Sequence, residues 1–154
     1  MKKLILASII LAVSFFSISN NVFAFDMKNE GEIEKLLDLN VGPDEYDLEL
    51  AHIDAMTFEN PEVTKMYNKY KKLNSDLKRG IMAEYREWNI EYYQLQGLIT
   101  AQKNFVYHTN KVFFHIWMKE QFPDYVEADE YVLKNYRAAR SNFATLKSLM
   151  HRKY

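Results

Sequence analysis

Four histidines are the side chains of this sequence with the clearest potential for chemistry, because imidazole nitrogens bind metal ions and haem iron. They are His52, His108, His115 and His151. His108 lies three residues after Phe105 and four before Val112, so in a helix it points roughly along the apolar face. His115 follows two turns later, and residues seven apart are separated by ~10 Å along a helix. The two cannot share one ion without a third element, and the favoured interpretation places both at the edge of a helical core.

Sequence motifs that would support catalysis are missing. The chain has no cysteine, which excludes a thiol nucleophile, a disulfide framework, a lipid-modified cysteine anchor and covalent c-type haem. It also lacks a glycine-rich phosphate loop, a zinc-protease pattern and a calcium loop. The acidic residues between Asp124 and Glu130 fit the start of a helix, where negative charge is favourable. We therefore expect a protein that is not an enzyme and needs no cofactor.

Tyrosine is frequent in this chain, with 11 residues, and its densest run lies at residues 84–93. Tyrosine and tryptophan dominate binding hot spots, although the same rings also pack at the edge of a thin helical core. Tyr85, Trp88 and Tyr92 follow the helical repeat, whereas Tyr93 falls off it. Because packing alone does not require Tyr93, these four residues are the candidate surface for another protein or for self-association.

A second hypothesis concerns haem. Leu146 and Lys147, followed by residues 151–154, resemble the C-terminus of the cytochrome b562 family. Members of that family are periplasmic four-helix proteins that hold haem between a histidine on the last helix and a methionine near the mature N-terminus. The resemblance implies Met27 and His151 as haem ligands. The competing interpretation makes His151 a solvated cation at the C-terminus of a helix.

The first two dozen residues have the layout of a secretory signal peptide, in which lysines precede an apolar run and small residues precede a cleavage site. The apolar run occupies residues 4–16, and we expect cleavage after Ala24. Residues 1–24 would then be a signal peptide and residues 25–154 a single all-helical domain, either periplasmic or secreted. The apolar run is too short to span a bilayer comfortably, and no run of ~20 apolar residues follows it, so we expect no stable membrane anchor.

Charge and composition narrow the class of protein further. After cleavage the chain would carry three more acidic than basic side chains, whereas proteins that bind nucleic acid need a basic surface. Glycine and proline number only four and three, so the chain has few places to turn. This scarcity is typical of long helices with short connections, and we expect an all-α, elongated antiparallel helical bundle.

Capping signals predict where the helices begin and end. A brief apolar repeat predicts a first helix at residues 33–37, and Asp44 can cap a second one. Asn60 followed by Pro61 predicts the start of a long helix, because proline fits the first helical position. Two cations precede Gly80 and an apolar residue follows it, as at many helix ends. We favour a turn at Gly80 over a phase slip within one long helix.

A proline at position 123 predicts the break between the two arms of a C-terminal helical hairpin, at about residues 82–121 and 125–152. The second arm has the most regular apolar repeat of the chain. It consists of Val132, Tyr136, Ala139, Phe143, Leu146 and Met150. We expect this face to pack on the preceding helix, as in a coiled coil, while Asn135 and Lys147 fall away from it.

Together these patterns predict an exported, non-enzymatic helical protein that binds another protein, such as an accessory factor in envelope assembly or secretion. The alternative is a periplasmic carrier of four-helix-bundle type that holds non-covalent haem or a metal, with His108 and His115 as further candidate ligands. An absorption spectrum of protein from its native compartment separates the two hypotheses, because bound haem gives a Soret band.

Overall fold

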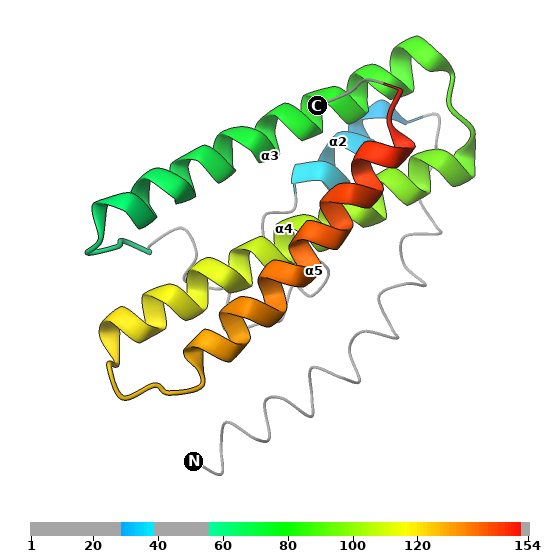
Figure 1. The fold of residues 1–154 in the computed structure, drawn as a ribbon. Helices are drawn as coiled ribbons and strands as arrows, with labels where there is room; N and C mark the ends of the chain where they lie inside the picture. The colour runs from blue at the N-terminus through cyan, green and yellow to red at the C-terminus, as the bar shows by residue number, and fades with distance from the viewer. Residues whose placement is uncertain (1–28, 39–55, 152–154) are drawn as a thin grey trace.

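The regular structure of the described residues is entirely helical. The computed structural model describes residues 29–38 and 56–151, and within these ranges it contains four helices and no strand. They are α2 (Glu30–Asp38), α3 (Pro61–Trp88), α4 (Tyr92–Gln121) and α5 (Ala128–Leu149). In Figure 1, α3, α4 and α5 run up, down and up along the long axis of the molecule. The expected all-α fold with a C-terminal hairpin is confirmed, and none of these helices is long and apolar enough to cross a bilayer.

Helix α3 begins where the capping signal predicts. The Asn60 side chain accepts a hydrogen bond of 2.9 Å from the backbone N–H of Glu62, and Pro61 is the first helical residue. However, α3 continues through Gly80 without a turn, and Gly80 is buried inside it. The turn that we favoured at Gly80 is therefore wrong. Glycine costs a helix interior only about 1 kcal/mol relative to alanine, which the burial of α3 easily offsets.

The chain turns at Asn89 instead. This residue has a left-handed backbone with φ 46° and caps the C-terminus of α3, a conformation that asparagine tolerates better than most residues. The first arm of the hairpin therefore begins at Tyr92 and not near residue 82. The break at Pro123 is confirmed, since α4 ends at Gln121 and α5 begins at Ala128.

Small residues bring α4 and α5 close together. Ala101 on α4 and Ala128 and Ala139 on α5 are buried. A Cβ added to Gly97 would lie 3.2 Å from Leu149 Cδ1, so the two helices nearly touch at that point. Interaxial distances in helix packing depend on the size of the contacting side chains. This explains why α4 and α5 form the most extensive pair in the described fold.

The buried face of α5 is rotated from the face that the apolar repeat predicts. Ala139, Leu146 and Met150 are buried as expected, but Tyr136 is 54% exposed. Asn135, which we expected to fall away, is buried because its side chain binds His108 of α4. The face thus turns toward Asn135, since a hydrogen bond to α4 compensates for burying the amide.

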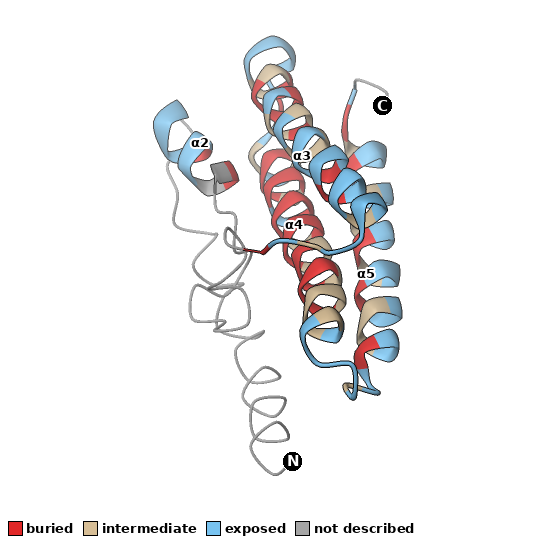
Figure 2. Cartoon of the chain, turned by 90° about the vertical axis from the view of Figure 1, so that its left-hand side faces the viewer, coloured by how far each residue is buried: buried red, intermediate tan, exposed pale blue. Residues whose placement is uncertain are grey.

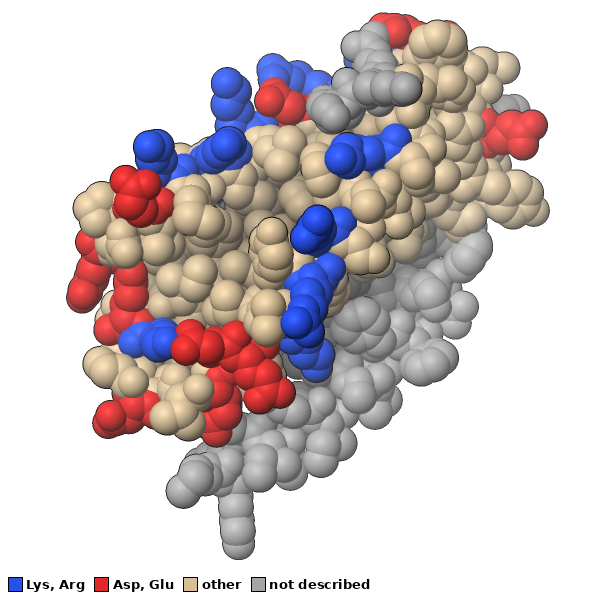
Figure 3. Space-filling model, in the orientation of Figure 1, with Lys and Arg blue, Asp and Glu red and all other residues tan. Residues whose placement is uncertain are grey.

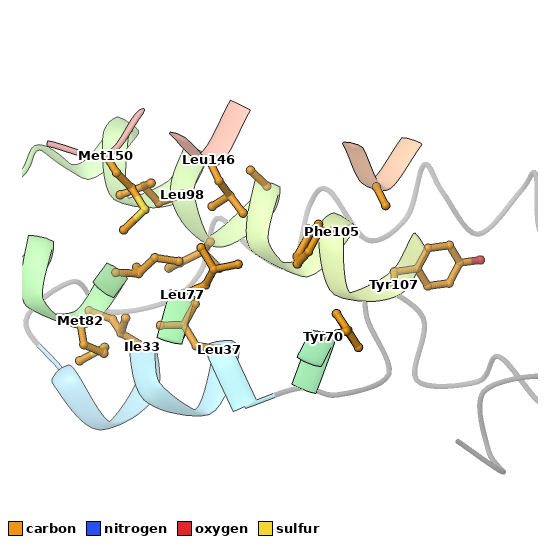
Figure 4. Close-up of a cluster of buried hydrophobic side chains, with 14 of the residues drawn as sticks. Ile33, Leu37, Tyr70, Leu77, Met82, Leu98, Phe105, Tyr107, Leu146 and Met150 are labelled. Carbon is orange, nitrogen blue, oxygen red and sulfur yellow. The ribbon is translucent and has the colours of Figure 1, made fainter. Parts of the chain in front are cut away.

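Large side chains fill the space between α3 and α4. An aromatic cluster joins the two helices, with Tyr67 and Tyr70 of α3 packed on Phe113 of α4 at ring-centroid distances of 4.9 and 5.9 Å. Figure 4 shows the apolar core continuing from Tyr70 and Phe105 to Leu77, Leu98 and Leu146. Figure 2 shows that buried residues cover much more of α4 than of α3 or α5. Helix α4 is therefore the central helix of the described fold.

The short helix α2 packs against both α3 and α4. Its residues Ile33 and Leu37 are buried, as the apolar repeat at residues 33–37 predicts, and Glu30 pairs with Arg86 of α3. The expected signal peptide, Met27 and the second helix that Asp44 would cap lie outside the described residues.

Candidate functional site

The four candidate partner-binding residues gather where α3 turns into α4, and we call them the aromatic bend: Tyr85, Trp88, Tyr92 and Tyr93. Trp88 is the last residue of α3 and is 52% exposed, whereas Tyr93 lies in the first turn of α4 and is 79% exposed. Tyr85 and Tyr92 are half-buried. Ile90, between the two helices, is buried and anchors the turn to the core. The structure therefore places two large rings in solvent on a fixed backbone.

A buried carboxyl group, that of Glu84, contacts the aromatic bend through His151. Glu84 is fully buried, and its Oε2 lies 2.7 Å from Nδ1 of His151, just beyond the end of α5. This distance is that of a hydrogen bond between the imidazole and the carboxyl group. The His151 ring also stacks on Trp88, with centroids 4.8 Å apart and planes only 6° from parallel. These contacts tie the C-terminal ends of α3 and α5 together and restrict the Trp88 side chain.

Neither interpretation of His151 anticipates this contact with Glu84. A signal for it was present in the sequence, because Glu84 continues the apolar repeat of Leu77 and Ile81 at a spacing that buries it. A carboxylate at such a position needs a polar partner. Haem ligation by His151 would have to proceed through Nε2 while Nδ1 remains bound to Glu84, and the implied partner Met27 lies outside the described residues.

His108 and His115 both serve the hairpin between α4 and α5. His108 Nδ1–H donates to Asn135 Oδ1 at 2.9 Å, and burial lowers the pKa of His108. His115 Nδ1 lies 3.0 Å from the Tyr125 hydroxyl, and its ring stacks on Tyr131 at 4.8 Å. The structure does not bring these two histidines to one site with His151. Within residues 29–38 and 56–151, no group of three histidine or carboxylate side chains could hold a metal ion.

The stability of the protein should fall on acidification because of His115. Burial, followed by repulsion from Lys111, lowers the pKa of His115 to about 4, from 6.5 in the unfolded chain. The unfolded state therefore takes up the proton first, so the contribution of His115 is complete above pH 6.5 and declines as the pH falls toward 4. Between these two pKa values the free energy of unfolding should fall by at most about 1.4 kcal/mol for each pH unit.

Urea unfolding of the wild type and of His115→Gln from pH 7.5 to pH 4 measures this effect. Glutamine can accept a hydrogen bond from the Tyr125 hydroxyl but does not titrate. The difference in unfolding free energy between the two proteins should stay constant above pH 6.5 and shift in favour of the variant below it. Parallel curves over the whole range would contradict the lowered pKa.

The acidic residues near Pro123 lie at the opposite end of the molecule from the aromatic bend. Asp129 and Glu130 occupy the first turn of α5, and Lys119 Nζ lies 2.6 Å from Asp129 Oδ1. Figure 3 shows acidic side chains gathered at this end, next to basic side chains farther along α5. Their arrangement fits compensation of the helix dipole by negative charge.

The chain matches no protein-family model, no curated protein and no solved structure. What the protein does must therefore be inferred from its own side chains.

Proposed function

We propose that this protein is exported and acts by binding another protein through the aromatic bend, without catalysis. The observation that supports this most is the exposure of Trp88 and Tyr93, which are 52% and 79% accessible. Burying an aromatic ring of this size is favourable by about 1.5–3 kcal/mol. A partner that covers both rings would gain this energy, and tryptophan and tyrosine are the residues most enriched at energetic hot spots.

Ring contacts within the protein itself hold side chains of the aromatic bend in place. Trp88 is held by its stack on His151, and Tyr92 and Tyr93 meet edge to face with centroids 5.7 Å apart. Immobilising a side chain on binding costs about 0.5–1.5 kcal/mol. Because this cost is partly met in the free protein, more of the contact energy remains for affinity. The exposed charged residues Glu87 and Glu91 supply the polar rim that such interfaces have.

Site-specific photo-crosslinking tests the aromatic bend directly. A photoreactive phenylalanine analogue at position 93 of the full chain, expressed in its native cell, should give a discrete adduct with a partner protein. Tyr93→Ala should lower the yield of the native complex at least tenfold, the scale of a hot-spot truncation. Its melting temperature should stay within about 2 °C of the wild type, because a ring that is 79% exposed contributes little to packing.

Val126 provides a matched control for this experiment. It is 81% exposed and apolar, but it lies in the α4–α5 connection at the other end of the molecule. The photoreactive residue at position 126 should give no discrete adduct. An adduct of twice the chain mass from position 93 identifies a second copy as the partner. Equal labelling from both positions, or none from position 93, would refute the proposal.

Export rests on the layout of residues 1–24 and is tested separately. Intact-mass measurement of the protein from its native compartment should give a chain that starts at Phe25. Retention of Met1 in that fraction would contradict cleavage. The same sample distinguishes the alternative function, because a Soret band from co-purified haem would favour the carrier, whereas a spectrum with aromatic absorption only is expected.

A further inference from the structure

A shallow groove with both apolar and polar lining runs along the contact between the first half of α4 and the second half of α5. Its volume is about 320 Å³, at the lower end of the ~300–1,000 Å³ of small-molecule sites. Gly97, Ala101 and Leu149 line its apolar part. Leu149 packs close to Gly97, so the groove, called here the α4–α5 groove, lies where the two helices are in close contact.

The polar lining of the α4–α5 groove consists of amides and hydroxyls. These are Tyr93, Gln96, Thr100, Asn104, Asn142 and Thr145. None of the described residues that line the groove carries a charge. A phosphate, carboxylate or amine would therefore lose its hydration without gaining an ion pair, which is unfavourable. The lining therefore favours a neutral ligand that combines apolar surface with hydrogen-bonding groups.

Two described residues, Gln96 and Gln102, have a buried side-chain atom without a hydrogen-bond partner, and of these Gln96 lines the groove. Gln96 is 8% exposed, and its Nε2 is buried without a hydrogen-bond partner. A buried donor left unpaired costs about 1–3 kcal/mol, so native proteins rarely keep one without a purpose. The terminal torsion of glutamine is soft, and a small rotation would present this donor to a molecule in the groove.

The two walls of the groove offer complementary hydrogen-bonding groups. On α5, Asn142 Nδ2 donates to the backbone oxygen of Ala138 and Thr145 Oγ1 donates to that of Ser141. Because both side chains line the groove, their oxygen atoms remain available as acceptors. On α4, Gln96 adds a donor. A hydroxyl group both donates and accepts, so a ligand with several hydroxyls can satisfy both walls.

We propose that the α4–α5 groove binds a neutral sugar unit, with Tyr93 at its rim packing on the apolar face of the ring. Tyr93 is 79% exposed, so its edge-to-face contact with Tyr92 leaves most of the ring accessible to such a ligand. Weak C–H contacts to an aromatic face add to the area that it buries. The site goes beyond the protein–protein function proposed above, and it shares only Tyr93 with the aromatic bend.

Nuclear magnetic resonance titration of the purified protein with N-acetylglucosamine and with glucose tests this site. At least one of the two sugars should give saturable shifts of the Gln96 and Asn142 side-chain amide signals, with a Kd near 1 mM or lower. Gln96→Met and Asn142→Leu should each weaken binding about tenfold, the effect of one lost hydrogen bond. Asn68→Leu, an amide exposed on α3, is the matched control and should change nothing.

The thermal stability of Gln96→Met distinguishes a binding role from a structural one. Replacing a glutamine whose buried Nε2 is unpaired by an apolar side chain of similar length should leave the melting temperature unchanged or raise it. Weakened sugar binding together with undiminished stability supports the proposal, and Tyr93→Ala should weaken binding while the exposed-tyrosine control Tyr136→Ala does not.

Three results would overturn the sugar site. They are the absence of saturable shifts up to 50 mM of either probe, binding that persists in both Gln96→Met and Asn142→Leu, and tighter binding of the neutral peptide N-acetyl-triglycine amide than of both sugars. Because Gln96 and Asn142 lie outside the aromatic bend, failure here leaves the crosslinking result at position 93 intact, and the reverse also holds.

Discussion

Replacing Leu146 by alanine should lower the free energy of unfolding by about 2–5 kcal/mol. Leu146 is fully buried between α4 and α5, where small residues hold the two helices close together. The alanine variant loses the transfer energy of the removed atoms and leaves a cavity that rigidly packed helices cannot close. Since a typical domain is stable by only about 5–15 kcal/mol, the shift in urea midpoint should be large.

Leu133→Ala is the matched control, because Leu133 belongs to the same helix but is 48% exposed. Its urea midpoint should stay close to that of the wild type. Phe143→Ala should fall between the two, since Phe143 is half-buried against Phe105 with ring centroids 5.4 Å apart. If Leu146→Ala and Leu133→Ala unfold at the same urea concentration, the α4–α5 hairpin is not packed as described.

The sequence is sufficient to predict the fold class and the hairpin because their determinants are local. Asn60 and Pro61 determine where α3 begins. Pro123 prevents the chain from continuing as one helix, so it lies in the connection between α4 and α5. The turn at Asn89 was missed because αL geometry is less costly for asparagine than for most residues, yet asparagine is also common elsewhere. Gly80 and the cations before it gave the stronger local signal for a helix end. The free energy gained by burying one face of α3 is larger than the cost of one glycine inside the helix.

The rotation of α5 could not be predicted from the apolar repeat. The repeat identifies which residues prefer burial, but Asn135 is buried because His108 lies opposite it on α4. That pairing depends on the register of the two helices, which is a property of the tertiary structure. Tyr136 then lies at the margin of the face, where a tyrosine can leave its ring partly in water.

The sequence predicts the exposure of the candidate site residues only in part, and it does not predict the contacts that support them. Sequence spacing places Tyr93 off the helical repeat, and Tyr93 is 79% exposed, but Trp88, which the spacing places on the repeat, is also 52% exposed. The link from His151 to Glu84 joins residues 67 positions apart. No local pattern encodes a contact of that separation, although an acidic residue on an apolar repeat indicates that a partner is needed.

The packing of α3 on α4 is tested by a second core substitution, Phe113→Ala, which should cost about 3–5 kcal/mol. Phe113 is 4% exposed and its ring meets those of Phe58, Tyr67 and Tyr70. Besides the buried area, each aromatic pair contributes about 0.5–1.5 kcal/mol, so the loss should exceed that of an aliphatic truncation at similar burial.

Phe122→Ala serves as the control for Phe113→Ala, since Phe122 is only nine residues farther along the chain but 58% exposed. Urea unfolding should give a much lower midpoint for Phe113→Ala than for Phe122→Ala. The outcome is independent of Leu146→Ala, because Phe113 tests α3 against α4 and Leu146 tests α4 against α5. If only Leu146→Ala is destabilised, the hairpin is stable by itself and α3, which carries Trp88, is docked less firmly than the aromatic cluster implies.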